Sequence, residues 1–121
     1  MLNLFVIDWN EEELYKNIEP FLKEGWNVGY EFNDEIYAKV NVENLKPDVI
    51  LIYLNNSPSK GRYAAHLIGE EESIKDIPLI FVGGKLKDVK KAKKEHPKAI
   101  YTTSDHLNEL LLNLQNRFLK R

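Results

Sequence analysis

Short apolar runs alternate five times with stretches of helical periodicity along the 121 residues. The apolar runs have the length of strands and cover residues 2–7, 26–32, 49–54, 77–82 and 98–103. The helical stretches cover residues 11–25, 33–46, 61–76, 85–97 and 104–121. Because parallel strands need helical crossovers, this strict alternation predicts an α/β fold with a doubly wound, five-stranded parallel sheet between two layers of helices.

Two segments refine this prediction. The run VILIYL, residues 49–54, is apolar on both faces of a strand, which is typical of the centre of a parallel sheet. In the first helical stretch, Pro20 predicts a kink or an early end, and Gly25 predicts the helix stop.

The composition indicates one domain over residues 1–121, with a mass of 14.1 kDa and no cysteine. The lack of cysteine excludes disulfides, zinc–thiolate sites and cysteine nucleophiles. The longest apolar run, residues 49–54, is too short to span a membrane, and the first residues carry no basic leader. We therefore expect a cytoplasmic protein with no membrane partner.

Charge is distributed unevenly along the chain. Residues 1–48 hold eleven acids and four bases, whereas residues 85–121 hold ten bases and four acids. This asymmetry can orient a protein partner or a second copy. The net charge of −2 argues against nucleic acid, because duplex binding is typical of net-basic domains.

Parallel α/β sheets place their functional pocket at the carboxyl ends of the strands. The residues at or just after the ends of the first, third, fourth and fifth predicted strands are Asp8-Trp9-Asn10, Tyr53, Gly83-Gly84 and Thr102-Thr103-Ser104. We expect these side chains to gather at one edge of the sheet.

Four segments resemble the receiver domain of bacterial two-component response regulators: VIDWNEEEL, KPDVILIYLNNSPSKG, IPLIFVGG and LNELLLNL. The resemblance extends over nearly the whole chain and implies a flavodoxin-like (βα)5 three-layer sandwich. Receiver domains use acids after the first and third strands to hold Mg²⁺ and to accept a phosphoryl group. A hydroxyl residue after the fourth strand and a lysine after the fifth contact that group.

Carried over residue by residue, the resemblance retains one of these five roles. Asp8 matches the first acid, while Trp9 replaces the second and Tyr53 replaces the phosphate acceptor. Gly83 stands for the hydroxyl residue, and Thr103, or Ser104 if the last loop is shorter, stands for the lysine. One carboxylate is a poor Mg²⁺ site, so we expect no metal, cofactor or catalytic residue and no enzymatic activity.

Two functions follow from these replacements. In the first, Trp9 and Tyr53 fill the old pocket, and the chain is a pseudo-receiver that acts as a phosphorylation-independent protein-interaction or regulatory module. In the alternative, the pocket at Trp9, Tyr53 and Gly83 is rebuilt for a small ligand or an anion.

A partner surface is also predicted between the fourth and fifth helices, because receivers dimerise and signal through this region. Its candidate residues are Lys87, Lys90, Lys91, Lys94, Leu112 and Leu119. An acidic protein or the acidic first helix of another copy, as in a homodimer, would suit the lysines. The alternative is an ordinary solvated helix face with scattered leucines.

Overall fold

A computed structural model describes residues 1–119, in which five strands and five helices alternate. The elements are β1 (Asn3–Ile7), α1 (Glu11–Lys23), β2 (Asn27–Glu31), α2 (Glu35–Leu45), β3 (Val49–Tyr53), α3 (Pro58–Glu70), β4 (Leu79–Val82), α4 (Leu86–Glu95), β5 (Ile100–Thr102) and α5 (Ser104–Leu119). The last two residues of the predicted helix 104–121 lie outside the described residues.

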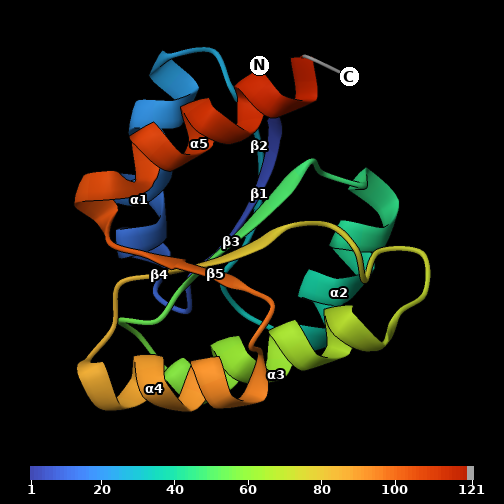
Figure 1. Cartoon of the computed structure of the whole chain (residues 1–121), viewed down its shortest axis with the longest axis vertical. Coiled ribbons are helices and arrows are strands. Elements are labelled where there is room, and N and C mark those ends of the chain that lie inside the picture. The colour runs from blue at the N-terminus through green and yellow to red at the C-terminus, as the bar shows by residue number, and fades with distance from the viewer. Residues whose placement is uncertain (120–121) are drawn as a thin grey trace.

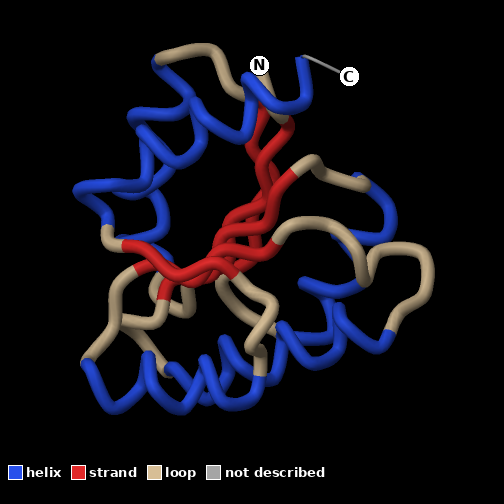
Figure 2. The backbone as a smooth tube through the Cα atoms, in the orientation of Figure 1, coloured by secondary structure: helices blue, strands red, loops and turns tan. Residues whose placement is uncertain are grey.

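The strands form one parallel sheet in the order β2-β1-β3-β4-β5. Helices α1 and α5 cover one face, and α2, α3 and α4 cover the other, as Figures 1 and 2 show. The predicted doubly wound, flavodoxin-like fold is therefore confirmed. No helix within residues 1–119 is long and apolar enough to cross a membrane.

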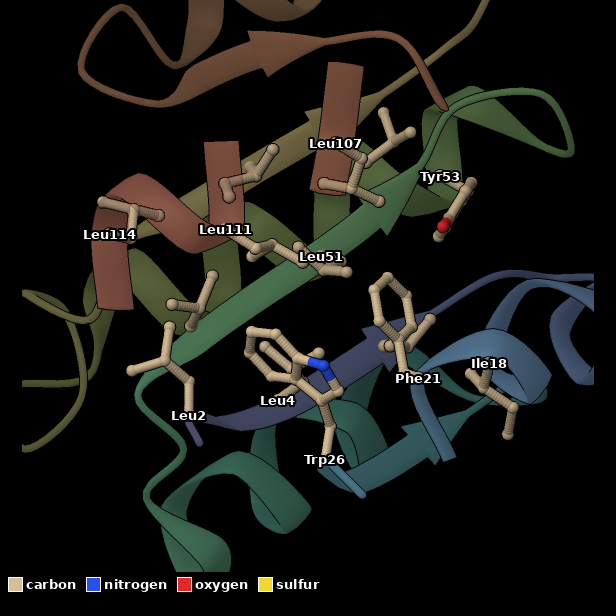
Figure 3. Close-up of a cluster of buried hydrophobic side chains, with 14 of the residues drawn as sticks. Leu2, Leu4, Ile18, Phe21, Trp26, Leu51, Tyr53, Leu107, Leu111 and Leu114 are labelled. Carbon is tan, nitrogen blue, oxygen red and sulfur yellow. The ribbon is translucent and has the colours of Figure 1, made fainter. Parts of the chain in front are cut away.

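The central strand β3 is buried along its whole length, as its apolar run predicts. Because successive side chains of a strand point to opposite faces, Leu51 and Tyr53 pack on the α1 and α5 side. Ile50 and Ile52 pack on the side of α2, α3 and α4. Figure 3 shows the first of these two cores, in which Tyr53 lies beyond Leu51 at the end of the strand.

The boundaries of α3 differ from the prediction of residues 61–76. Pro58 occupies the first turn, where its missing N–H costs no hydrogen bond, so the helix begins earlier. It ends at Glu70, and Ile74 is buried from the following turn instead.

Helix α1 does not end early at Pro20 but runs on to Lys23. The carbonyl of Pro20 still accepts a hydrogen bond from the N–H of Glu24 at 3.2 Å. Gly25 then takes a positive φ of 87°, a conformation that favours glycine, and ends the helix as predicted.

Candidate functional site

A cavity of about 310 Å³ opens at the carboxyl ends of the strands. Its lining consists of Asp8, Glu13, Lys16, Asn17, Tyr53, Asn55, Val82, Gly83, Thr103 and Ser104. The structure thus brings together Asp8, Tyr53, Gly83 and Thr103 of the predicted set, whereas Trp9 is not part of the lining.

Asp8 is the one charged residue of the described chain that is buried, with 1% of its surface exposed. Its Oδ2 accepts a hydrogen bond from Asn17 Nδ2 at 3.0 Å, and its Oδ1 accepts one from Asn56 Nδ2 at 3.1 Å. Burial raises the pKa of Asp8, and the two amide donors partly offset that rise. Asp8 is therefore a desolvated carboxyl group held by side-chain amides.

Asn56 joins this carboxylate to a second one. Its Nδ2 also donates to Glu13 Oε2, so a single amide nitrogen lies between the two acids. Asn10 serves the backbone instead, because its Oδ1 caps α1 by accepting from the N–H of Glu13 at 2.9 Å. Polar contacts within the chain thus occupy both oxygens of Asp8.

Three of these residues were missed in the sequence. Asn17 carries a usable signal, because it lies three residues after Leu14 and next to Ile18 and therefore borders the buried face of α1. Asn56 has no such signal, because its position depends on the path of the loop between β3 and α3. Glu13 lies in the first turn of α1, and its contact with Asn56 depends on that same loop.

Tyr53 closes the inner wall of the cavity and is 6% exposed. Burial, together with the nearby Asp8 carboxylate, raises the pKa of its phenol to about 12. The hydroxyl is therefore protonated at neutral pH and is a poor nucleophile.

Trp9 points to the other side of the sheet and packs against the core of α2, α3 and α4. Lys60 Nζ lies 4.8 Å from the centre of its ring, a cation–π distance. Within residues 1–119, Trp9 Nε1 is the buried side-chain nitrogen or oxygen that has no hydrogen-bond partner. The two aromatic residues expected to fill one pocket therefore lie on opposite faces.

Gly83 and Gly84 adopt positive φ values of 70° and 95°. Their N–H groups are already engaged: Gly83 donates to Thr102 O at 2.9 Å and Gly84 donates to Asn55 Oδ1 at 3.1 Å. An anion at this turn would have to displace these bonds, so the glycines serve the turn itself.

No protein-family model and no curated protein match the chain. Solved structures do, among them the N-terminal domain of a response regulator receiver protein from Methanoculleus marisnigri. It is 14% identical, with a TM-score of 0.68 over 100% of this chain and 98% of that chain. The chemotaxis response regulator CheY4 of Vibrio cholerae is 15% identical, with a TM-score of 0.74 over 94% and 98%. NtrX from Brucella abortus is 16% identical, with a TM-score of 0.76 over 99% of this chain and 28% of that chain.

The chain has the fold of response-regulator receiver domains. The cavity lies where the resemblance in sequence places the receivers' magnesium and phosphate site. Within residues 1–119, no group of three or more His, Asp or Glu side chains is arranged to hold a metal ion. Because Mg²⁺ needs several oxygen ligands and Asp8 is already bound to two amides, the residues present do not fit that ion.

Elsewhere on the receiver fold, the four lysines of the predicted partner surface are all exposed. Lys91 also borders a hollow of about 440 Å³ between α3 and α4, opposite Arg62. All four lysines are thus accessible to solvent, and Lys91 lies on the side of α4 that faces α3.

Leu112 and Leu119 are exposed on α5 but do not join this surface. They lie three and four residues from Gln115 and share its side of the helix. Gln115 Oε1 accepts from the N–H of Leu2, just before β1, so this side of α5 turns toward β1 and away from the edge strand β5. The predicted partner residues therefore occupy two separate surfaces.

Proposed function

We propose that the chain is a pseudo-receiver, a receiver-like signalling domain that works without aspartyl phosphorylation and without enzymatic activity. Its role is that of a protein-interaction or regulatory module. One observation carries this proposal: the side-chain amide of Asn56 lies between Asp8 and Glu13, where it hydrogen-bonds carboxylate oxygens that a metal ion would need as ligands.

The acceptor position supports the same function. Tyr53 ends β3 in place of a carboxylate, and its buried phenol has a pKa of about 12. Formation of an acyl phosphate needs a carboxylate nucleophile, and Asp8 is enclosed by amides at the end of a different strand. The acceptor position therefore provides no group whose phosphorylation could switch the domain between two states.

The first test is an amide NMR titration of the chain with MgCl₂ and then with beryllofluoride, a phosphate mimic. We expect no shifts beyond those of a NaCl control of equal ionic strength. Shifts that start at Asp8 and Tyr53 and extend to β5 would disprove phosphorylation independence.

The interaction partner is proposed to be an acidic protein that binds the exposed lysines of α4. Helix α4 carries five lysines against Asp88 and Glu95, and Glu95 already pairs with Arg62 at 3.2 Å. A 20-residue polyglutamate peptide is a suitable probe. We expect amide shifts confined to α4 that vanish in the variant K87E/K90E/K94E and persist in the control K23E, because Lys23 lies on α1.

The second candidate function is the binding of a small ligand in the cavity. It is favoured by the cavity's volume of about 310 Å³, which shows that the aromatic residues do not fill the site. The lining contains two acids, Asp8 and Glu13, and one base, Lys16. The N–H groups of Gly83 and Gly84 already donate hydrogen bonds within the chain. A small polar or cationic ligand therefore suits the cavity better than an anion.

Ligand binding is tested by thermal unfolding with small amines and, in parallel, with acetate and phosphate at equal ionic strength. Stabilisation by an amine that is lost in the variant Glu13→Gln, which removes a lining charge at an exposed position, would support the second function. Equal responses to amines and anions would count against it.

A further inference from the structure

The outer edge of β2 is open. β2 ends the sheet order, so within residues 1–119 only its β1 side is paired with another strand. Exposed apolar side chains surround this edge. We call Tyr15, Leu22, Tyr30, Tyr37 and Leu45 the β2 patch; their exposed fractions run from 42% to 63%.

Contacts and helical spacing place the β2 patch around the strand. The ring of Tyr30 lies 5.8 Å from that of Tyr15 on α1, and Leu22 follows Tyr15 by seven residues on the same side of that helix. On the other face, Leu45 packs over Gly29, where a Cβ would approach it to 2.8 Å. Tyr37 lies four residues before Asn41, whose amide reaches Glu31 of β2.

The opposite edge of the sheet is protected, which makes β2 distinctive. β5 is three residues long, and Lys93 Nζ lies 5.4 Å from the ring of its Tyr101. Short edge strands and lysines are the usual means of blocking strand pairing. β2 has five residues, NVGYE, without lysine or proline, and therefore lacks these protections.

The backbone of β2 is ready to accept another strand. The N–H of Asp8 bonds Glu31 O, and Val6 is in register with Tyr30. Since a parallel ladder uses alternate residues, Asn27, Gly29 and Glu31 bond to β1. The N–H and C=O groups of Val28 and Tyr30 point outward.

We propose that a second copy of this chain pairs with β2 across a two-fold axis at Gly29, forming a continuous ten-stranded sheet. In this antiparallel register Val28 and Tyr30 exchange both backbone hydrogen bonds with Tyr30 and Val28 of the other copy. On one face of the joined sheet, Val28 of each copy also packs against Tyr30 of the other copy. On the opposite face, Asn27 of each copy lies across from Glu31 of the other, so no like charges are opposed. This self-complementarity is what an isologous interface requires.

Acidic residues near the β2 patch are engaged within their own chain. Glu31 accepts from the N–H groups of Asn33 and Asp34 at 2.9 and 3.1 Å. Glu11 accepts from the Tyr15 hydroxyl at 3.0 Å, and Glu19 pairs with Lys23 at 3.0 Å. The remaining repulsion between the two copies is screened by salt, so the dimer strengthens as ionic strength rises.

Sedimentation equilibrium of the full chain from 10 µM to 1 mM tests this dimer. The expected mass rises from 14.1 kDa toward twice that value. Tyr30→Lys places a charge at the edge and should weaken association at least tenfold. Tyr63→Lys is the matched control, because it makes the same change at an exposed tyrosine of α3, away from the β2 patch, and should leave association unchanged.

Amide hydrogen exchange locates the interface independently. Exchange at Val28 and Tyr30 should slow as protein concentration rises, while α4 and α5 exchange at a constant rate. A chain that stays monomeric at 1 mM overturns the proposal. The outer edge of β2 would then be free to pair with a strand from a different protein. A dimer that survives Tyr30→Lys also overturns it; if circular dichroism shows that variant to be unfolded, Tyr15→Lys takes its place.

Discussion

Replacing Asn56 by alanine removes the amide that joins Asp8 to Glu13. A hydrogen bond to a charged group contributes about 1.5–3 kcal/mol, and the bond to Asp8 has the larger share because that carboxylate is 1% exposed. We expect a loss of about 2 kcal/mol at pH 7. With a urea m-value of about 2 kcal/mol/M, the unfolding midpoint should fall by about 1 M.

The loss of stability caused by Asn56→Ala should be larger at pH 7 than at pH 4. The pKa of Asp8 is raised by burial, so between its unfolded and folded pKa values the folded state binds more protons. Stability therefore falls as pH rises through this window. Without the Asn56 donor the folded pKa rises further, so the variant should lose more stability than the wild type between pH 4 and pH 7.

Urea unfolding followed by circular dichroism at both pH values measures this effect. Asn113→Ala, at an exposed position on α5, is the control and should change stability by less than about 0.5 kcal/mol. If Asn56→Ala matched this control at pH 7, or lost more stability at pH 4 than at pH 7, the assigned role of the amide would be wrong.

Three further predictions use the same unfolding assay. Tyr53→Ala should lower the free energy of unfolding by about 3–5 kcal/mol, because it removes a buried aromatic ring. Tyr53→Phe keeps the ring and should lower it far less; equal losses would contradict this. Gly84→Ala should destabilise the fold by more than about 1 kcal/mol, because the φ of Gly84 is 95° and the added Cβ would lie 2.7 Å from Leu54 Cβ. Gly69→Ala is the control: its added Cβ meets no atom within 4 Å, so this variant should be more stable than the wild type. Burial lowers the pKa of His96, so the unfolded chain gains its proton first and stability should fall as pH drops below about 6.5; His96→Gln should flatten that dependence.

The sequence predicts the order of elements well because short apolar runs alternate with helical stretches along the whole chain, even where a single element such as β5 has only three residues. The misplaced end of α3 has a local cause, since Ile74 continues the apolar pattern past Glu70 but is buried from a turn and not from the helix. Pro20 was expected to kink α1 or to end it early, but the helix continues for less than one more turn, to Lys23, and retains the bond from Glu24 to Pro20.

The part of the site that can be predicted from the sequence is the part that the geometry of the strands determines. The gathering of Asp8, Tyr53, Gly83 and Thr103 follows from the common edge at which parallel strands end. The separation of Trp9 follows from the same geometry, because a residue next to Asp8 faces the opposite side of the sheet. The Asn56 bridge does not follow, because it depends on a loop whose path no periodicity describes.

The cavity and the lysines of α4 are physically connected. Asn55 lines the cavity, and its Oδ1 accepts the N–H of Gly84 two residues before α4 begins. A molecule bound against Asn55 would therefore act on the start of the helix that carries the proposed partner surface. The two candidate functions are thus compatible, with the ligand as a regulator of partner binding.

Pairing at β2 also has a consequence for partner binding. The sheet order puts β2 and β5 at opposite ends, so a dimer joined at β2 leaves the α4 lysines of both copies free. Nine strand spacings of about 4.8 Å separate the two outer β5 strands by roughly 43 Å. A partner with two acidic segments that span this distance would bind the dimer with higher avidity than either site alone. Tyr30→Lys should abolish that gain while leaving the affinity for a single polyglutamate peptide unchanged, because it removes the second site and does not alter the first.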